Sequence, residues 1–142
     1  MINFDEYRDV FVVADTIDDV VHPVTYELIG QARRIAKELG QLVQVMLLGE
    51  NVQAEAEELV AHGADIVHVF ESPLLKYYTT DGYTKVLTDF FEDHKPNILL
   101  IGATNNGRDL APRMSGRMQN GVVADCTILT LSLIHISEPT RP

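Results

Sequence analysis

The sequence has few cysteines and few positive charges, and each shortage excludes a class of protein. Cys126 is the only cysteine among 142 residues, which excludes an intrachain disulfide framework and a thiolate metal cluster and fits a reducing compartment. Lysine and arginine number 11 against 21 aspartates and glutamates, and the formal net charge is −10. The long-range field of such a chain repels phosphate polyanions, so nucleic acid is not an expected partner.

Signals for export, membrane insertion and several kinds of catalysis are also missing. The amino terminus reads MINFDEYRD, with acids where a secretory signal needs a basic region, and no apolar stretch approaches membrane-spanning length. No pair of histidines has a metal-ligand spacing, and no serine or cysteine has a flanking GxSxG-type signature. We therefore expect a cytoplasmic protein with no metal site, no catalytic residue and no membrane insertion.

The chain does have a regular alternation of apolar runs and amphipathic segments. Helical spacing of apolar residues marks segments between these runs, and the first such helix has Pro23 at its entry and Gly40 at its carboxyl end. This alternation predicts right-handed crossovers, a mostly parallel sheet and one α/β three-layer sandwich of the Rossmann-like kind. The expected buried strands are residues 10–14, 42–49, 66–70 and 97–101.

In sheets of this kind ligands bind beyond the carboxyl ends of the strands, near the point where the strand order reverses. The residues at or just after the ends of the expected strands are Asp15, Gly49, Phe70 with Glu71, and Gly102. We therefore expect these residues to share the edge of the sheet at which a ligand would lie.

The segment GATNNGRDLAPR, residues 102–113, follows the last expected strand. It lacks the lysine and the GxxxxGK[ST] spacing of a phosphate loop, and GxGxxG is absent too. Two interpretations stay open. In one, amides at the helix start and Arg108 hold an anion such as a nucleotide phosphate. In the other, Gly107 adopts positive φ, Asp109 caps a helix with Pro112 in its first turn, and the loop only turns the chain.

The candidate site residues lie in this segment and in the helical turn that follows it. Arg113 and Arg117 lie one helical turn apart and project from one face of the helix. They could bind an anion together, form a solvated surface pair, or make a salt link between subunits. The candidates for cofactor binding are Asn105, Asn106, Gly107 and Arg108, and the candidates for partner contact are Asp109, Arg113 and Arg117.

Residues 8–130 resemble the amino-terminal domain of the electron transfer flavoprotein alpha subunit. The match runs in order along this range and is more specific than any single glycine motif. The segments that carry it are PVTYELIGQARRIAKELG, HGAD at 62–65, YTTDGY at 78–83 and KPNILLIGATNNGRDLAPRMSGRMQNGVVADCT at 95–127. Ser115 and Gly116 stand where small alanines are usual in the family.

The resemblance implies a function for the longer parent protein. Members of this family carry electrons through FAD from flavin dehydrogenases, such as acyl-CoA dehydrogenase in fatty acid beta-oxidation, to an acceptor. The redox FAD lies in a carboxyl-terminal domain that we expect to be absent here. The present domain would be a scaffold that contacts the beta subunit in a heterodimer, would hold no FAD alone, and would not be an enzyme in itself.

The last residues differ in character from the rest. Residues 131–141 read LSLIHISEPTR, which resembles a translated sequencing adapter, although alternation alone allows another strand. We therefore expect the family domain to cover residues 1–130 and residues 131–142 to be an adapter-derived artefact. The alternative function is a stand-alone nucleotide-binding module of the universal-stress type, which shares the fold of the adenine nucleotide alpha hydrolase group.

Overall fold

The computed structural model describes residues 8–94, 96–102, 104–117, 122–126 and 131–135. Its main element is a six-stranded sheet in the order β5-β4-β1-β6-β7-β8. Strands β5 to β7 in this order run parallel, and β8 is antiparallel to β7. The strands are β1 (Val10–Val13), β4 (Val43–Gly49), β5 (Ile66–Glu71), β6 (Ile98–Gly102), β7 (Val122–Cys126) and β8 (Leu131–His135).

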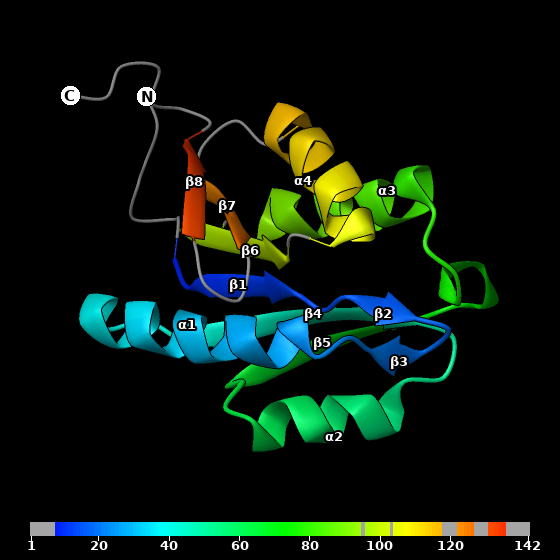
Figure 1. The fold of residues 1–142 in the computed structure, drawn as a ribbon, viewed down its shortest axis with the longest axis horizontal. Coiled ribbons are helices and arrows are strands. Elements are labelled where there is room, and N and C mark those ends of the chain that lie inside the picture. Colours follow the sequence, from blue (N-terminus) through cyan, green and yellow to red (C-terminus); the bar gives the residue numbers. More distant parts are fainter. Residues whose placement is uncertain (1–7, 95, 103, 118–121, 127–130, 136–142) are drawn as a thin grey trace.

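Helices cover both faces of the sheet, as Figure 1 shows. Helices α1 (Val24–Leu39) and α2 (Gln53–Ala61) lie on one face, and α3 (Thr80–Asp93) and α4 (Asn105–Arg117) lie on the other. The predicted fold class, a mostly parallel Rossmann-like three-layer sandwich, is therefore confirmed.

The apolar runs are continuous because each strand is covered on both faces. Val10 and Val12 of β1 pack in the core under α1 and α2, whereas Phe11 and Val13 pack under α3 and α4. Residues of β1 are at most 4% exposed. Alternate side chains thus supply two separate cores, which explains why a period-two pattern is missing from the sequence.

The ends of α1 lie where the sequence predicts them. Pro23 precedes the helix, and Gly40 follows it in the left-handed conformation with φ of 67°. Its backbone N–H bonds back to the carbonyls of the last turn, which is the usual glycine termination.

A hairpin, β2 (Thr16–Ile17) and β3 (Val20–Val21), follows β1 and is absent from the sequence-based prediction. Its turn residues Asp18 and Asp19 have φ of 51° and 64°, as a two-residue type I′ turn requires. The sequence does carry a signal for it, because two aspartates tolerate positive φ and are flanked by the β-branched pairs TI and VV. A short 3₁₀ helix, η2 (Pro73–Leu75), was not predicted either.

Candidate functional site

The strand order reverses between β1 and β6. From β1 the chain moves outward to β4 and β5, and it then returns to β6 on the other side of β1. A crevice forms where the carboxyl ends of β1 and β6 diverge, which is the usual ligand position in this fold. The structure places Asp15, Gly49, Glu71 and Gly102 at this carboxyl edge, as expected.

Gly107 lies in the first turn of α4, directly against the end of β6. A Cβ at Gly107 would be 1.7 Å from the carbonyl oxygen of Gly102, so no other residue fits without moving the helix. The expectation of a positive φ at Gly107 is wrong, because positive-φ glycines in the described chain are Gly40 and Gly63. Glycine is needed here for close backbone approach.

Thr104, and not Asp109, caps α4. The Thr104 Oγ1 accepts a hydrogen bond from the Gly107 N–H at 3.1 Å, and the Thr104 carbonyl accepts from the Arg108 N–H at 2.8 Å. The helix therefore begins at Asn105, five residues earlier than an Asp109 cap would place it, and Pro112 lies inside it rather than in its first turn. The prediction of the cap is wrong because threonine also serves as an N-cap residue and Thr104 stands directly before the first helical residue.

Asp109 instead ties α4 to the segment before α3. Its Oδ2 accepts a 2.8 Å hydrogen bond from the Tyr78 hydroxyl and a second from Thr80 Oγ1. The bond from Thr80 is the largest cause that lowers the pKa of the Asp109 carboxyl, and the bond from Tyr78 is the next. Burial is the main cause that raises the pKa of Tyr78 to about 12. Arg113, one turn along, lies 3.8 Å from Asp81 Oδ1.

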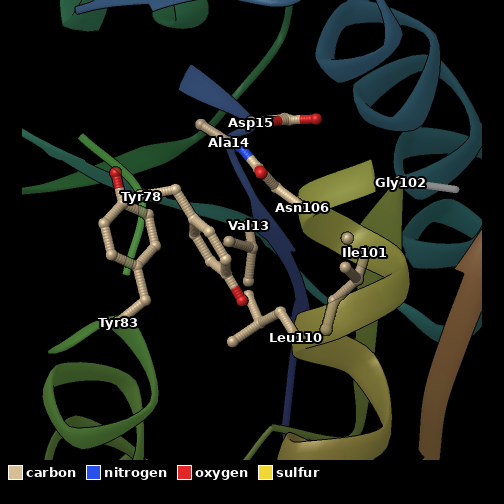
Figure 2. Close-up of a pocket in the computed structure, with 10 residues that line it drawn as sticks. Val13, Ala14, Asp15, Tyr78, Tyr83, Ile101, Gly102, Asn106 and Leu110 are labelled. Atoms are coloured by element: carbon tan, nitrogen blue, oxygen red, sulfur yellow. The ribbon is translucent and has the colours of Figure 1, made fainter. Parts of the chain in front are cut away.

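The crevice itself is narrow and lined mainly by apolar and aromatic side chains, which Figure 2 shows. Its remaining volume is about 20 Å³. That volume suits about one water molecule, whereas pockets for small ligands occupy roughly 300–1,000 Å³. The lining residues are Val13, Ala14, Asp15, Tyr78, Tyr83, Ile101, Gly102, Asn106, Gly107 and Leu110.

The four predicted cofactor-binding residues are split by this geometry. Asn106 and Gly107 line the crevice, whereas Asn105 and Arg108 are exposed and are not among its lining residues. Of the predicted partner-contact residues, Asp109 and Arg113 are exposed, and the side chain of Arg117 lies outside the described part. Their roles stay predictions.

A buried polar network beneath the crevice was missed by the sequence analysis. The Thr16 Oγ1 donates to the Leu48 carbonyl at 3.0 Å, and the Tyr83 hydroxyl donates to the Leu75 carbonyl at 3.2 Å. The two hydroxyls are 3.3 Å apart, and burial raises the pKa of Tyr83. The network fastens the β2–β3 hairpin and η2 to the end of β4, so the crevice has a rigid floor.

Asp15 is the acid nearest the switch point. Its backbone N–H donates to Thr25 Oγ1 at 3.0 Å. Its Oδ2 is buried and has no hydrogen-bond partner among the described residues. An acceptor in this position disfavours an incoming phosphate, which presents only acceptors and negative charge.

Strand order and crevice together define a doubly wound α/β domain of the dinucleotide-fold class, in which the described residues leave about 20 Å³ at the usual ligand position. Comparison with known proteins gives the particular family. The family model of the electron transfer flavoprotein domain matches residues 10–136, and the chain therefore belongs to the electron transfer flavoprotein family. The match includes β8, and the predicted domain boundary at residue 130 stays a prediction.

Curated relatives agree with this assignment. The chain is 45% identical to the electron transfer flavoprotein subunit alpha of Megasphaera elsdenii over 87% of its length, and 46% identical to the lactate dehydrogenase (NAD(+),ferredoxin) subunit LctC of Acetobacterium woodii over 88%. It is 42% identical over 92% to the acryloyl-CoA reductase electron transfer subunit beta of Anaerotignum propionicum. The predicted resemblance to the alpha subunit is thus confirmed. The chain spans 37%, 30% and 36% of these relatives' own lengths.

Among the described residues, no helix is long and apolar enough to cross a membrane.

Proposed function

We propose that this chain is the scaffold and subunit-contact domain of an electron transfer flavoprotein alpha subunit. In this proposal the full-length parent carries electrons through FAD between flavin dehydrogenases and an acceptor, and it pairs with a beta subunit. The observation that carries the scaffold role is the closed crevice at the strand switch point, with its volume of about 20 Å³. A domain of a flavoprotein family that fills its own ligand position is suited to support rather than to redox chemistry.

The described residues do not fit a flavin. Gly107 leaves no space between α4 and the end of β6, and Leu110, Tyr83 and Ile101 occupy the crevice as buried side chains. The unpartnered Asp15 oxygen offers no donor for a phosphate. We therefore assign the FAD of the parent protein to sequence beyond these 142 residues and derive no redox step for this chain.

Exposed apolar side chains support the subunit-contact role. Around the β2–β3 hairpin and η2 at the carboxyl edge, Ile17 is 59% exposed, Val20 67%, Leu74 84% and Tyr77 63%; we name these four residues the hairpin surface. Lys76, which follows η2, lies beside the hairpin turn, since its Nζ is 3.6 Å from Asp18 Oδ1 and 3.9 Å from Glu50 Oε1. Grouped exposed apolar side chains of this kind mark protein contacts.

A binding measurement with the beta-type subunit of the same organism tests this function. We expect the wild-type chain to form a complex, Val20→Asp to weaken it at least tenfold, and Val60→Asp to leave it unchanged. Val60 is a matched control because it is 53% exposed on α2, away from the hairpin. Absence of any wild-type complex contradicts the proposed function, whereas a Val20→Asp complex of wild-type affinity contradicts only the choice of surface.

A flavin titration tests the scaffold role separately. The visible absorption of FAD reports on the isoalloxazine ring, and we expect the 142-residue chain to leave it unchanged. An amide spectrum recorded with ATP separates the universal-stress alternative, which predicts shifts at Gly102, Asn106 and Gly107. Shifts at those amides, or a perturbed flavin spectrum, would contradict a scaffold whose crevice is closed.

A further inference from the structure

A second concave region lies at the opposite edge of the sheet, beyond the amino ends of the strands. It is formed by the carboxyl end of α1, cyan in Figure 1, the start of β4 and the residue before β5. Its volume is about 410 Å³, within the range of pockets that hold small molecules. We name it the basic groove, and its lining residues are Arg33, Arg34, Ala36, Lys37, Gln41, Leu42, Val43 and Asp65.

The charge of the groove is opposite to that of the chain. Three cations, Arg33, Arg34 and Lys37, lie within five residues of a protein whose net charge is −10. On a helix Lys37 is the neighbour of both arginines, and like charges at these spacings destabilise a helix. The helix dipole accounts for Lys37 in the last turn of α1, but its effect does not reach Arg33 and Arg34. A bound anion would offset the repulsion among all three.

Arg33 is already held in place. Its Nη1 donates a 2.9 Å hydrogen bond to the Gly63 carbonyl. The stem lies flat on Gly63, since a Cβ added there would come within 2.4 Å of the Arg33 Cδ. An arginine fixed in this way loses little side-chain entropy when it binds a ligand, and its remaining N–H groups are free to donate.

Gln41 presents a donor to the same groove. Its Oε1 accepts hydrogen bonds from the Asp9 N–H at 2.8 Å and from Asn97 Nδ2 at 3.3 Å. With the carbonyl oxygen occupied, the amide nitrogen is the group left to interact with a ligand. Asp65 is the one acid of the lining, and its Oδ2 is engaged by the Val43 N–H at 2.9 Å. Donors therefore outnumber free acceptors along the groove.

From these features we propose that the basic groove binds a small organic molecule that carries a polyvalent oxyanion, either phosphate or carboxylate. The three cations and the Gln41 amide would hold the oxyanion. The apolar part of the molecule would lie on Leu42, which is 46% exposed. This inference does not depend on the proposed function, because the groove and the hairpin surface lie at opposite edges of the sheet.

Amide spectra of the full 142-residue chain, titrated with inorganic pyrophosphate and separately with citrate, test the proposal. Ionic strength is held constant, since exposed charges are screened by salt. We expect shifts at Arg34, Lys37 and Gln41, a Kd tighter than about 1 mM, and no shift at Gly102 or Gly107. Binding of one probe only supports the site and identifies its anion as phosphate or carboxylate.

Variants of exposed side chains localise the binding without affecting the fold. Arg34→Gln and Lys37→Gln should each weaken the better probe at least tenfold. Lys85→Gln is the matched control, because it removes the same charge from the exposed face of α3, where Lys85 pairs with Asp89. No shift at the groove amides with either probe, or equal weakening by Lys85→Gln, would overturn the proposal. Loss of beta-subunit binding would instead bear on the proposed function alone.

Discussion

The two edges of the sheet differ in how they use space. At the carboxyl edge, where proteins of this fold bind ligands, backbone and side chains are packed until about 20 Å³ remain. At the amino edge, an open basic groove of about 410 Å³ runs beside α1. The fold therefore keeps its strand order while the customary ligand position becomes part of the core. Strand order thus indicates where a ligand site can form in this fold, and the packing of side chains at that position decides whether one does.

The largest expected effect comes from Gly107, which holds the carboxyl edge closed. Gly107→Ala puts a Cβ into the Gly102 carbonyl oxygen, and we expect a loss of about 4 kcal/mol in the free energy of unfolding, because α4 must shift. Urea unfolding measures it. Gly30→Ala in α1 is the control, since nothing lies within 4 Å of an added Cβ, and it should stabilise by up to about 1 kcal/mol. Equal changes in the free energy of unfolding for the two variants would contradict the close approach of α4 to the end of β6 at Gly107.

Leu110→Ala should open the crevice from the side. Leu110 is 3% exposed and lines the cavity, so we expect a loss of about 3 kcal/mol in the free energy of unfolding. The enlarged cavity would make the carboxyl edge of the sheet more open, as the amino edge already is. Leu39→Ala, at a residue 45% exposed on α1, should change stability by less than about 1 kcal/mol. If Leu110→Ala lowered the free energy of unfolding by as little as Leu39→Ala, the side chains of the crevice would not be tightly packed.

Tyr78→Phe removes one hydrogen bond between the α3 segment and Asp109. We expect a loss of about 1 kcal/mol below pH 10. Because the pKa of folded Tyr78 is about 12 against an ordinary 10.0, the folded state keeps its proton while the unfolded state loses it. Wild-type stability therefore falls as pH rises from 10 toward 12. The variant should show a smaller fall, because the raised pKa values of Tyr83 and Tyr26 remain in it. Urea midpoints across this range measure it, and equal slopes would contradict the raised pKa.

The smallest expected effect concerns a hydrogen-bonded chain at the amino edge. His68 Nε2 donates to Gln44 Oε1 at 2.6 Å, and Gln44 Nε2 donates to Asp9 Oδ2 at 2.6 Å. Burial, and next the charge of His94, lower the pKa of His68 below 6.5. Below pH 6.5 the unfolded state binds more protons, so stability should fall as the solution is acidified through this window.

His68→Gln should reduce the acid-side slope of stability against pH. His62→Gln is the control, because His62 is exposed on the far side of the molecule, after α2. Urea midpoints between neutral pH and the lowered pKa measure both slopes. If both variants reduce the slope equally, burial of His68 is not its cause.

Local patterns predicted the elements whose causes are local. The apolar runs gave the strands because the helices cover both faces of each one, and Pro23 and Gly40 marked the ends of α1. The β2–β3 hairpin was missed although Asp18 and Asp19 carried a readable turn signal. The hairpin was missed because each of its strands has only two residues, too few to show a periodic pattern.

The candidate site depended on contacts that the local sequence does not contain. Asp109 suits an N-cap by residue type, but its partners Tyr78 and Thr80 lie 31 and 29 residues away. Glycine is required at position 107 because the Gly102 carbonyl lies close across the loop, and not because of a positive φ. The closure of the crevice likewise needs side chains from β1, α3 and α4 together, and no single segment reveals it.

Strand β8 has a consequence for the outer boundary of the sheet. It pairs with every residue of β7 from Val122 to Cys126, so it occupies hydrogen-bonding groups that would otherwise face solvent. A strand exposed in that way is a template for pairing with another copy of the chain. Among the described residues β8 is in turn the outermost strand, so residues 131–135 move the edge of the sheet outward by one strand and do not remove it.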